Sequence, residues 1–158
     1  VGIKIIKNDT DLKLLNLDNN SFAQEFIPGE EFTAGVTRYK KHIYLIPLKR
    51  QLKKGDTIYS KFEMSYLKDL SSKLVNIYTK FNFYGPVNFQ FKIFKKKIYI
   101  FEINPRFSGT TFIRSMFGYN EFKIFINEMI YGKKVKVILK EGEVIRFYSQ
   151  KFLVRSSK

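Results

Sequence analysis

Three oxygen-bearing side chains, Gln90, Glu102 and Asn104, lie in a segment whose alternation predicts a β-hairpin over residues 87–104. If the turn centres on Lys96, Gln90 lies directly opposite Glu102. Directly opposed side chains have Cβ atoms about 4.5–5.5 Å apart, so the three oxygens converge on one small volume. One carboxylate with two neutral oxygens suits Mg²⁺ that is shared with substrate phosphates better than a permanent metal cage.

A guanidinium follows this set directly, because Arg106 comes after Pro105. The planar fork of an arginine matches phosphoryl and carboxylate oxygens, so we expect anion chemistry at this end of the hairpin. The alternative is a solvated polar sheet face with an incidental arginine.

The opposite face of the hairpin is predicted to pack on a core. Strict alternation places these side chains on the apolar face: Val87, Phe89, Phe91, Ile93, Tyr99, Phe101 and Ile103. It places Ile98 and Ile100 on the same face as Glu102.

The elements around the hairpin mix strands and helices without regular βαβ alternation, which favours an α+β fold. The clearest helix is predicted over residues 65–81, with an apolar stripe at three- and four-residue steps whose aromatic members we assign to the core. Further helices are expected over residues 10–17, 110–117 and 121–131. Strands are expected over residues 1–6, 21–27, 31–39, 42–48, 57–63, 135–139 and 143–154.

Composition limits the chemistry. The 158 residues include no cysteine and a single histidine, His42, for which a solvated role is expected. Thiolate catalysis and multi-histidine metal sites are therefore excluded. No apolar run reaches the length of a bilayer span, and the expected compartment is the cytoplasm.

The net charge of +15 has two interpretations. Its lysines gather at predicted turns, such as Lys95-Lys96-Lys97, which is typical of solvated loops. The other interpretation is a basic face for anionic ligands such as nucleotide phosphates. No helix-turn-helix, zinc-finger or ribonucleoprotein pattern is present, so no specific nucleic-acid partner is expected.

Two motifs resemble the ATP-grasp superfamily. Residues 102–109, E-I-N-P-R-F-S-G, resemble its E-x-N-P-R signature, in wording closest to the carbamoyl-phosphate-synthase-like branch. The N-x-Q segment at 88–90 resembles the same branch. Residues 24–33, Q-E-F-I-P-G-E-E-F-T, resemble the adenine hinge and the strand that follows it. The resemblance implies an ATP-grasp fold, which is mainly an antiparallel sheet with flanking helices.

The resemblance also implies roles for individual residues. The nucleotide would be bound by Gln24, Glu25, Phe26, Ile27 and Glu31, with Glu31 accepting hydrogen bonds from the ribose hydroxyls. One or two Mg²⁺ ions, or Mn²⁺, would be held by Gln90, Glu102 and Asn104, and Arg106 would bind the transferring phosphoryl group.

Three further basic residues are weaker candidates for substrate or phosphate contacts: Arg50, Lys61 and Arg114. Arg50 follows Pro47 where related proteins often have a basic residue that faces the substrate, and a solvated turn is the alternative. Lys61 lies on the next predicted strand. Arg114 lies one helical turn beyond Thr110-Thr111.

The upstream lysine and Gly-rich loop of ATP-grasp enzymes are not found in this sequence. We therefore expect residues 1–20 to be the tail of an N-terminal ATP-grasp subdomain and residues 21–158 to form the C-terminal subdomain, inactive by itself. The implied function is an ATP-dependent ligase that activates a carboxylate as an acyl phosphate for an amine or ammonia, with a homodimer as one expected assembly and no membrane partner expected. The alternatives are a non-catalytic nucleotide-binding module and a basic RNA-binding domain.

Overall fold

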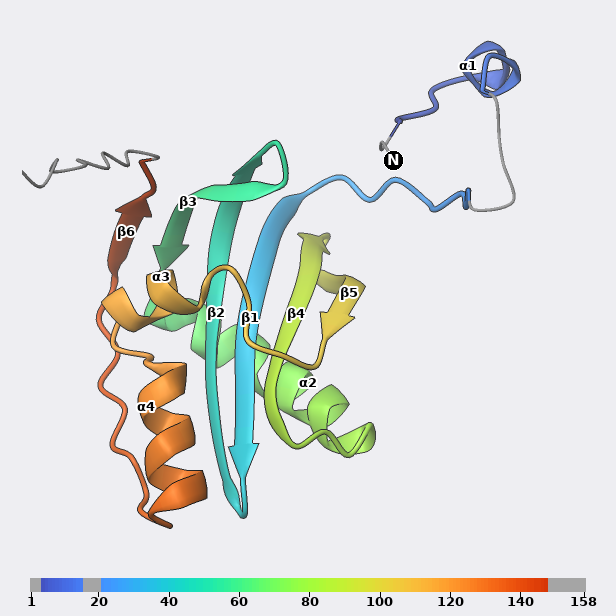
Figure 1. Cartoon of the computed structure of the whole chain (residues 1–158). Helices are drawn as coiled ribbons and strands as arrows, with labels where there is room; N and C mark the ends of the chain where they lie inside the picture. The colour runs from blue at the N-terminus through green and yellow to red at the C-terminus, as the bar shows by residue number, and fades with distance from the viewer. Residues whose placement is uncertain (1–3, 16–20, 148–158) are drawn as a thin grey trace, which may run out of the picture.

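The structure is a computed structural model that describes residues 4–15 and 21–147. In these residues, six antiparallel strands form one sheet in the order β5-β4-β1-β2-β3-β6 (Figure 1). The strands are β1 (Glu30–Tyr39), β2 (His42–Lys53), β3 (Asp56–Phe62), β4 (Gly85–Phe94), β5 (Lys97–Asn104) and β6 (Gly142–Ile145). The helices are α1 (Asp9–Lys13), α2 (Met64–Lys80), α3 (Thr111–Met116), α4 (Glu121–Phe125) and the π-helix η1 (Ile126–Ile130).

The sheet is covered on both faces, α2 lying on one side and α3 with α4 on the other (Figure 1). Each face has its own core because the alternation of a strand sends successive side chains to opposite sides. The core under α2 contains Phe32, Ala34, Val36, Leu70, Leu74, Tyr78, Val87, Phe89 and Phe91. The core under α3 and α4 contains Tyr39, Tyr44, Ile46, Leu48, Phe62, Ile113, Phe117, Tyr119 and Ile124.

The long hairpin of β4 and β5 has the predicted register at its functional end, where Gln90 lies opposite Glu102. Nearer the turn the register shifts, because β5 carries one extra residue, Phe101, as a β-bulge. The bulge exchanges the faces of the residues that precede it. Ile98 and Ile100 therefore pack on the α2 core, and Phe101 is 40% exposed.

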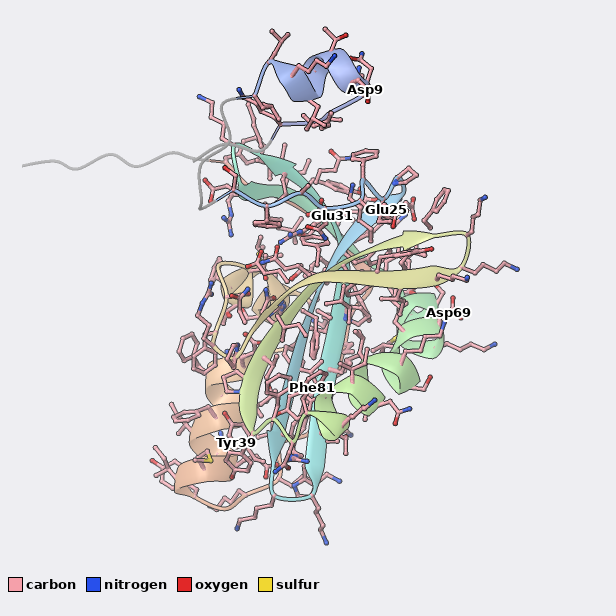
Figure 2. The ribbon with its side chains drawn as sticks, turned by 90° about the vertical axis from the view of Figure 1, so that its right-hand side faces the viewer. Asp9, Glu25, Glu31, Tyr39, Asp69 and Phe81 are labelled. Atoms are coloured by element: carbon pink, nitrogen blue, oxygen red, sulfur yellow. The ribbon has the colours of Figure 1, made fainter. Side chains whose placement is uncertain are left out.

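The prediction that Tyr99 and Phe101 share the core face was therefore wrong, and so was the placement of Ile98 and Ile100 on the polar face. Strict alternation assumes an uninterrupted ladder, and nothing in the local sequence marks the inserted residue. The predicted helix over residues 65–81 extended one residue too far, because α2 ends at Lys80. Phe81, whose ring we assigned to the core, lies beyond the last turn of α2 and is 62% exposed (Figure 2).

The bulge leads to a stability prediction. Replacing the fully buried Phe89 by alanine should cost about 3–5 kcal/mol of unfolding free energy, because a cavity remains in the α2 core. Phe101→Ala removes the same side chain from a surface position in the same hairpin, and should cost less than about 1 kcal/mol. Urea denaturation of both variants measures the difference. Equal costs would contradict the bulge.

Several predicted strands are not strands in the structure. Residues 21–27 and 135–139 do not form strands, and neither do residues 4–6. Apolar residues in these segments satisfied the strand pattern, but the chain there runs outside the hydrogen-bonded ladder. The part of the predicted last strand beyond residue 147 lies outside the described residues. No helix in the described ranges is long and apolar enough to cross a membrane.

Candidate functional site

The three predicted metal ligands lie on the face of the sheet that α3 and α4 cover. Gln90 on β4 is opposite Glu102 on β5, and Asn104 ends β5 opposite Asn88. The Asn104 amide Nδ2 donates a hydrogen bond to Glu102 Oε1 at 2.6 Å. Glu102 is exposed, so a ligand can reach its carboxylate.

This donor set fits a hard divalent cation that is shared with a phosphate. It offers one carboxylate, two side-chain amide oxygens and no histidine or cysteine, which is oxygen chemistry throughout. Among the described residues, no group of three or more Asp, Glu, His or Cys side chains is placed to hold a metal ion. The remaining ligands of a metal at Glu102 would therefore come from water or from a bound phosphate.

Arg50 connects the predicted ribose contact with the predicted metal ligands. Its Nε and Nη2 donate to Glu31 Oε1 at 3.0 and 2.8 Å, and Nη2 also donates to Gln90 Oε1. Arg50 is only 8% exposed, so this is a largely desolvated, charge-assisted contact rather than a solvated turn. Strand order explains it, because β1 lies between β2 and β4 and brings the three side chains together on one face.

The predicted adenine hinge, residues 24–27, lies as an irregular segment beside the start of β1. Figure 2 shows Glu25 and Glu31 near each other at this end of the sheet, far from Tyr39 at the other end of β1. Lys92 on β4 holds the segment: its Nζ donates to the Ile27 carbonyl at 3.0 Å and lies 4.9 Å from the centre of the Phe26 ring.

Gly29 allows the hinge to approach the sheet so closely. Its φ of 122° is in the region that glycine favours, and a Cβ at this position would lie 2.2 Å from the backbone oxygen of Ile93. Pro28-Gly29 therefore turns the chain and also allows the hinge segment to lie directly against β4.

Arg106 lies with Arg50 and Gln90 in the lining of one small polar pocket of about 140 Å³. The other lining residues are Gly55, Asp56, Thr57, Asn88, Ser108, Gly109, Thr110 and Arg146. The structure thus brings Arg106, Arg50 and Gln90 to one place from three different elements. All three residues were singled out from the sequence.

Arg114 does not reach this pocket. It is 1% exposed and forms a buried ion pair with Glu121, with Nη1 and Oε1 3.0 Å apart. Its Nη2 donates to Thr33 Oγ1 at 3.1 Å and to Asn88 Oδ1. The structure gives Arg114 an interior role, fixing α3 and α4 to the sheet beneath the candidate site, in place of the substrate contact expected from the sequence.

Lys61 lies on the other face of the sheet. It pairs with Lys49, whereas Arg50 pairs with Ser60, so alternation points Lys61 away from Arg50 and Gln90. Its Nζ lies 2.7 Å from Glu63 Oε1, and this hydrogen bond raises the pKa of Lys61 to about 12. The structure does not bring Lys61 to the candidate phosphate site.

Two residues of the site region were not predicted from the sequence. Lys92 shares the strand face of Asn88 and Gln90, so the period-two alternation that identified Gln90 also carried a signal for Lys92. Arg146 follows β6, far along the chain from Arg106, and only the pairing of β6 with β3 brings it to the pocket.

Several solved structures have a similar fold. N5-carboxyaminoimidazole ribonucleotide synthetase from Thermus thermophilus is 12% identical, with a TM-score of 0.62 over 75% of this chain and 35% of its own. N5-carboxyaminoimidazole synthetase from Staphylococcus aureus, complexed with ADP, is 16% identical, with a TM-score of 0.58 over 71% of this chain and 31% of its own.

A putative ATP-grasp superfamily protein from Archaeoglobus fulgidus is 15% identical, with a TM-score of 0.56 over 77% of this chain and 40% of its own. The chain thus spans about a third of the length of these solved proteins. At these identities the likeness establishes the fold, which is the predicted ATP-grasp fold.

The sequence model of one ATP-grasp family, described as ATP-grasp in the biosynthetic pathway with Ter operon, matches residues 19–149. The chain belongs to this family. No curated protein sequence matches it significantly. The predicted superfamily is confirmed, and none of these comparisons singles out the carbamoyl-phosphate-synthase-like branch.

Proposed function

We propose that this chain is the ATP- and Mg²⁺-binding part of an ATP-dependent ligase that joins a carboxylate to an amine or ammonia. The observation that carries the proposal is the contact of Arg50 with both Glu31 and Gln90. It places the side chain suited to ribose hydroxyls beside the side chains suited to a metal on one sheet face. Arg106 lines the same pocket.

The reaction divides into two balanced steps. A carboxylate oxygen attacks the γ-phosphorus of ATP as the bond from that phosphorus to ADP breaks, which gives an acyl phosphate. The amine nitrogen then attacks the acyl carbon, the bond to phosphate breaks, and the nitrogen loses a proton. Neither step needs a nucleophile from the protein, which suits a chain without cysteine.

The side chains of the site would provide position and charge. A Mg²⁺ ion, when bound, neutralises charge on the phosphates. Glu102, Gln90 and Asn104 would hold it, and Arg106 would stabilise the negative charge on the transferring phosphoryl group. Residues 21–158 would form the C-terminal ATP-grasp subdomain and residues 1–20 the end of the N-terminal one.

Two substitutions separate nucleotide binding from chemistry. Glu31→Ala should weaken ATP binding by about 1.5–3 kcal/mol, because charge-assisted hydrogen bonds are lost. Arg106→Ala should mainly lower kcat, because the charge it meets develops during transfer. Both effects are measured on the intact protein that contains this chain, because the chain alone is expected to be inactive: isothermal titration with Mg²⁺ and ATP gives the first, and carboxylate-dependent phosphate release gives the second.

Glu30→Ala is the matched control for Glu31→Ala, because Glu30 pairs with Lys49 on the other face of the sheet. It should leave ATP affinity unchanged. If Arg106→Ala alters only ATP affinity, the catalytic role of Arg106 is wrong. Tight ATP binding with no phosphate release for any carboxylate would favour a non-catalytic nucleotide-binding module.

A further inference from the structure

Two lysine pairs that are far apart in the sequence lie side by side at one end of the molecule. Lys40 and Lys41 form the turn between β1 and β2, and Lys133 and Lys134 follow η1. The Lys40 Nζ lies 3.7 Å from the position that a Cβ on Gly132 would take, so the two segments are neighbours. Figure 1 shows the β1–β2 turn and the end of the helix that follows α4 at the same end of the sheet.

A buried carboxylate holds the two segments together. Glu128 is 2% exposed and accepts hydrogen bonds from the Tyr44 hydroxyl and from His42 Nδ1, the latter at 3.0 Å. The Val135 amide in turn donates to the Tyr44 hydroxyl at 3.2 Å. His42 is therefore paired and only partly exposed, where the sequence predicted a solvated role. These contacts begin immediately next to both lysine pairs, which fixes where the four lysines lie.

The positive charge at this end is not balanced by carboxylates. All four lysines are exposed, and among the described residues none of them forms an ion pair. Glu128, the carboxylate between the two segments, is buried and already bound by His42 and Tyr44. Four neighbouring cations repel one another, and an anionic surface relieves that repulsion.

Exposed apolar side chains adjoin the lysines. Ile130 and Tyr131, which come just before Lys133, are 65% and 63% exposed. Met129 is 45% exposed and accepts a hydrogen bond from the Tyr84 hydroxyl at 3.3 Å. Exposed apolar side chains beside cations are typical of a protein surface that meets a membrane, where the apolar groups enter the acyl boundary and the lysines contact anionic head groups.

We propose that this basic end of the molecule binds the surface of a membrane that contains anionic lipids. The basic end is defined by Lys40, Lys41, Ile130, Tyr131, Lys133 and Lys134. A polyanion in water, such as a nucleic acid, would neutralise the lysines but leave Ile130 exposed, whereas a lipid interface accommodates both kinds of side chain. The contact is peripheral and needs no membrane-spanning helix. No membrane partner was expected from the sequence, because the two lysine pairs meet only in the folded chain.

Binding through the basic end would leave the candidate site open to water. Figure 2 shows Glu25 and Glu31 at one end of the sheet and Tyr39, the residue before Lys40, at the other. The proposal therefore does not depend on the ligase function, and it can succeed or fail independently of ATP binding.

The test is cosedimentation of the intact protein that contains this chain with vesicles of phosphatidylcholine and phosphatidylserine. Vesicles of phosphatidylcholine alone are the neutral reference. The protein should bind the anionic vesicles, and added salt should weaken the binding. Lys133→Gln/Lys134→Gln should weaken it roughly thirtyfold, because each lysine near an anionic surface contributes about fivefold.

Lys95→Gln/Lys96→Gln is the matched control, because it removes two exposed lysines from the turn at the other end of β4. Residue pairing shows the separation: the start of β4 lies opposite Arg38, near Lys40, and its end lies opposite Glu30. The control should bind anionic vesicles nearly as well as the original protein. Equal losses in the two double variants, or no binding of the original protein to anionic vesicles, would contradict the proposal.

A second arm tests the apolar part of the contact. The 158 residues contain no tryptophan, so Tyr131→Trp adds an indole whose emission is obtained by subtracting the spectrum of the original protein. Its emission should shift to the blue with anionic vesicles and stay unchanged with neutral ones. Vesicle binding without this shift would overturn the proposal, because a purely electrostatic contact does not bury Tyr131. Binding of a single-stranded oligoribonucleotide through the same lysines, with no binding to vesicles, would assign the basic end to nucleic acid instead.

Discussion

Replacing Glu102 by glutamine should lower carboxylate-dependent ATP turnover by about 10²–10³-fold or more, because the single carboxylate of the proposed metal site is lost. Gln90 and Asn104 retain neutral oxygens, which hold a divalent cation much more weakly without Glu102. The glutamine keeps the shape of the side chain and can still bond to Asn104, whose Nδ2 contacts Oε1 in the structure.

The stability of the protein should hardly change, because Glu102 is exposed and its carboxylate lies on the face away from the α2 core. Thermal denaturation of both proteins checks this point. Glu143→Gln is the matched control: it removes an exposed carboxylate near Lys61, on the far side of the sheet, and should leave turnover unchanged. Full turnover in Glu102→Gln would rule out the metal assignment.

A large loss of stability, equal to that expected for Phe89→Ala, is expected at the interior ion pair of Arg114 and Glu121. Arg114→Met should lower the unfolding free energy by about 3–5 kcal/mol, because it leaves the Glu121 carboxylate buried without its countercharge. Among the side-chain hydrogen bonds of the described residues, Glu121 would keep the one from Thr111 Oγ1, at 2.5 Å. Guanidinium chloride denaturation measures the effect.

The double variant Arg114→Met/Glu121→Leu tests the cause. If the cost comes from an uncompensated charge, removing the second charge should recover part of the lost stability. A double variant no more stable than Arg114→Met would show that the uncompensated Glu121 charge is not the main cause of the loss.

The buried pair also bears on the site above it. Arg114 Nη2 bonds to Asn88, which is one strand position from Gln90 along the same face of β4. Gly35 makes room for the pair, since a Cβ there would lie 2.5 Å from Glu121 Oε1 and 2.7 Å from Arg114 Nη1. The interior network therefore fixes β4, which carries Gln90 and pairs with the strand of Glu102 and Asn104.

The local sequence pattern was sufficient to predict the elements that have a strong hydrophobic periodicity. The β1–β2 hairpin turns at Lys40-Lys41, and α2 spans nearly the predicted residues, because each buries one apolar face whose spacing is visible in the sequence. The predicted opposition of Gln90 and Glu102 is present, but it depends on the Phe101 bulge, because the register at the turn, with Phe94 opposite Lys97, would otherwise place Phe101 opposite Gln90. Residues 21–27 misled the prediction because an apolar run alone does not show whether a neighbouring strand will pair with it.

The fold family, the oxygen-rich hairpin and the arginine beside it could be predicted without a structure, because these are encoded in short, contiguous segments. Which basic residues lie at the candidate site depends on contacts between distant segments of the folded chain. Arg50, Lys61 and Arg114 looked alike as isolated cations, yet one lies in the pocket, one on the opposite sheet face and one in the interior. Strand order, the Phe101 bulge and the β3–β6 pairing made that choice and added Arg146. These contacts join segments far apart in the chain, and their free energies depend on packing that no local window of sequence contains.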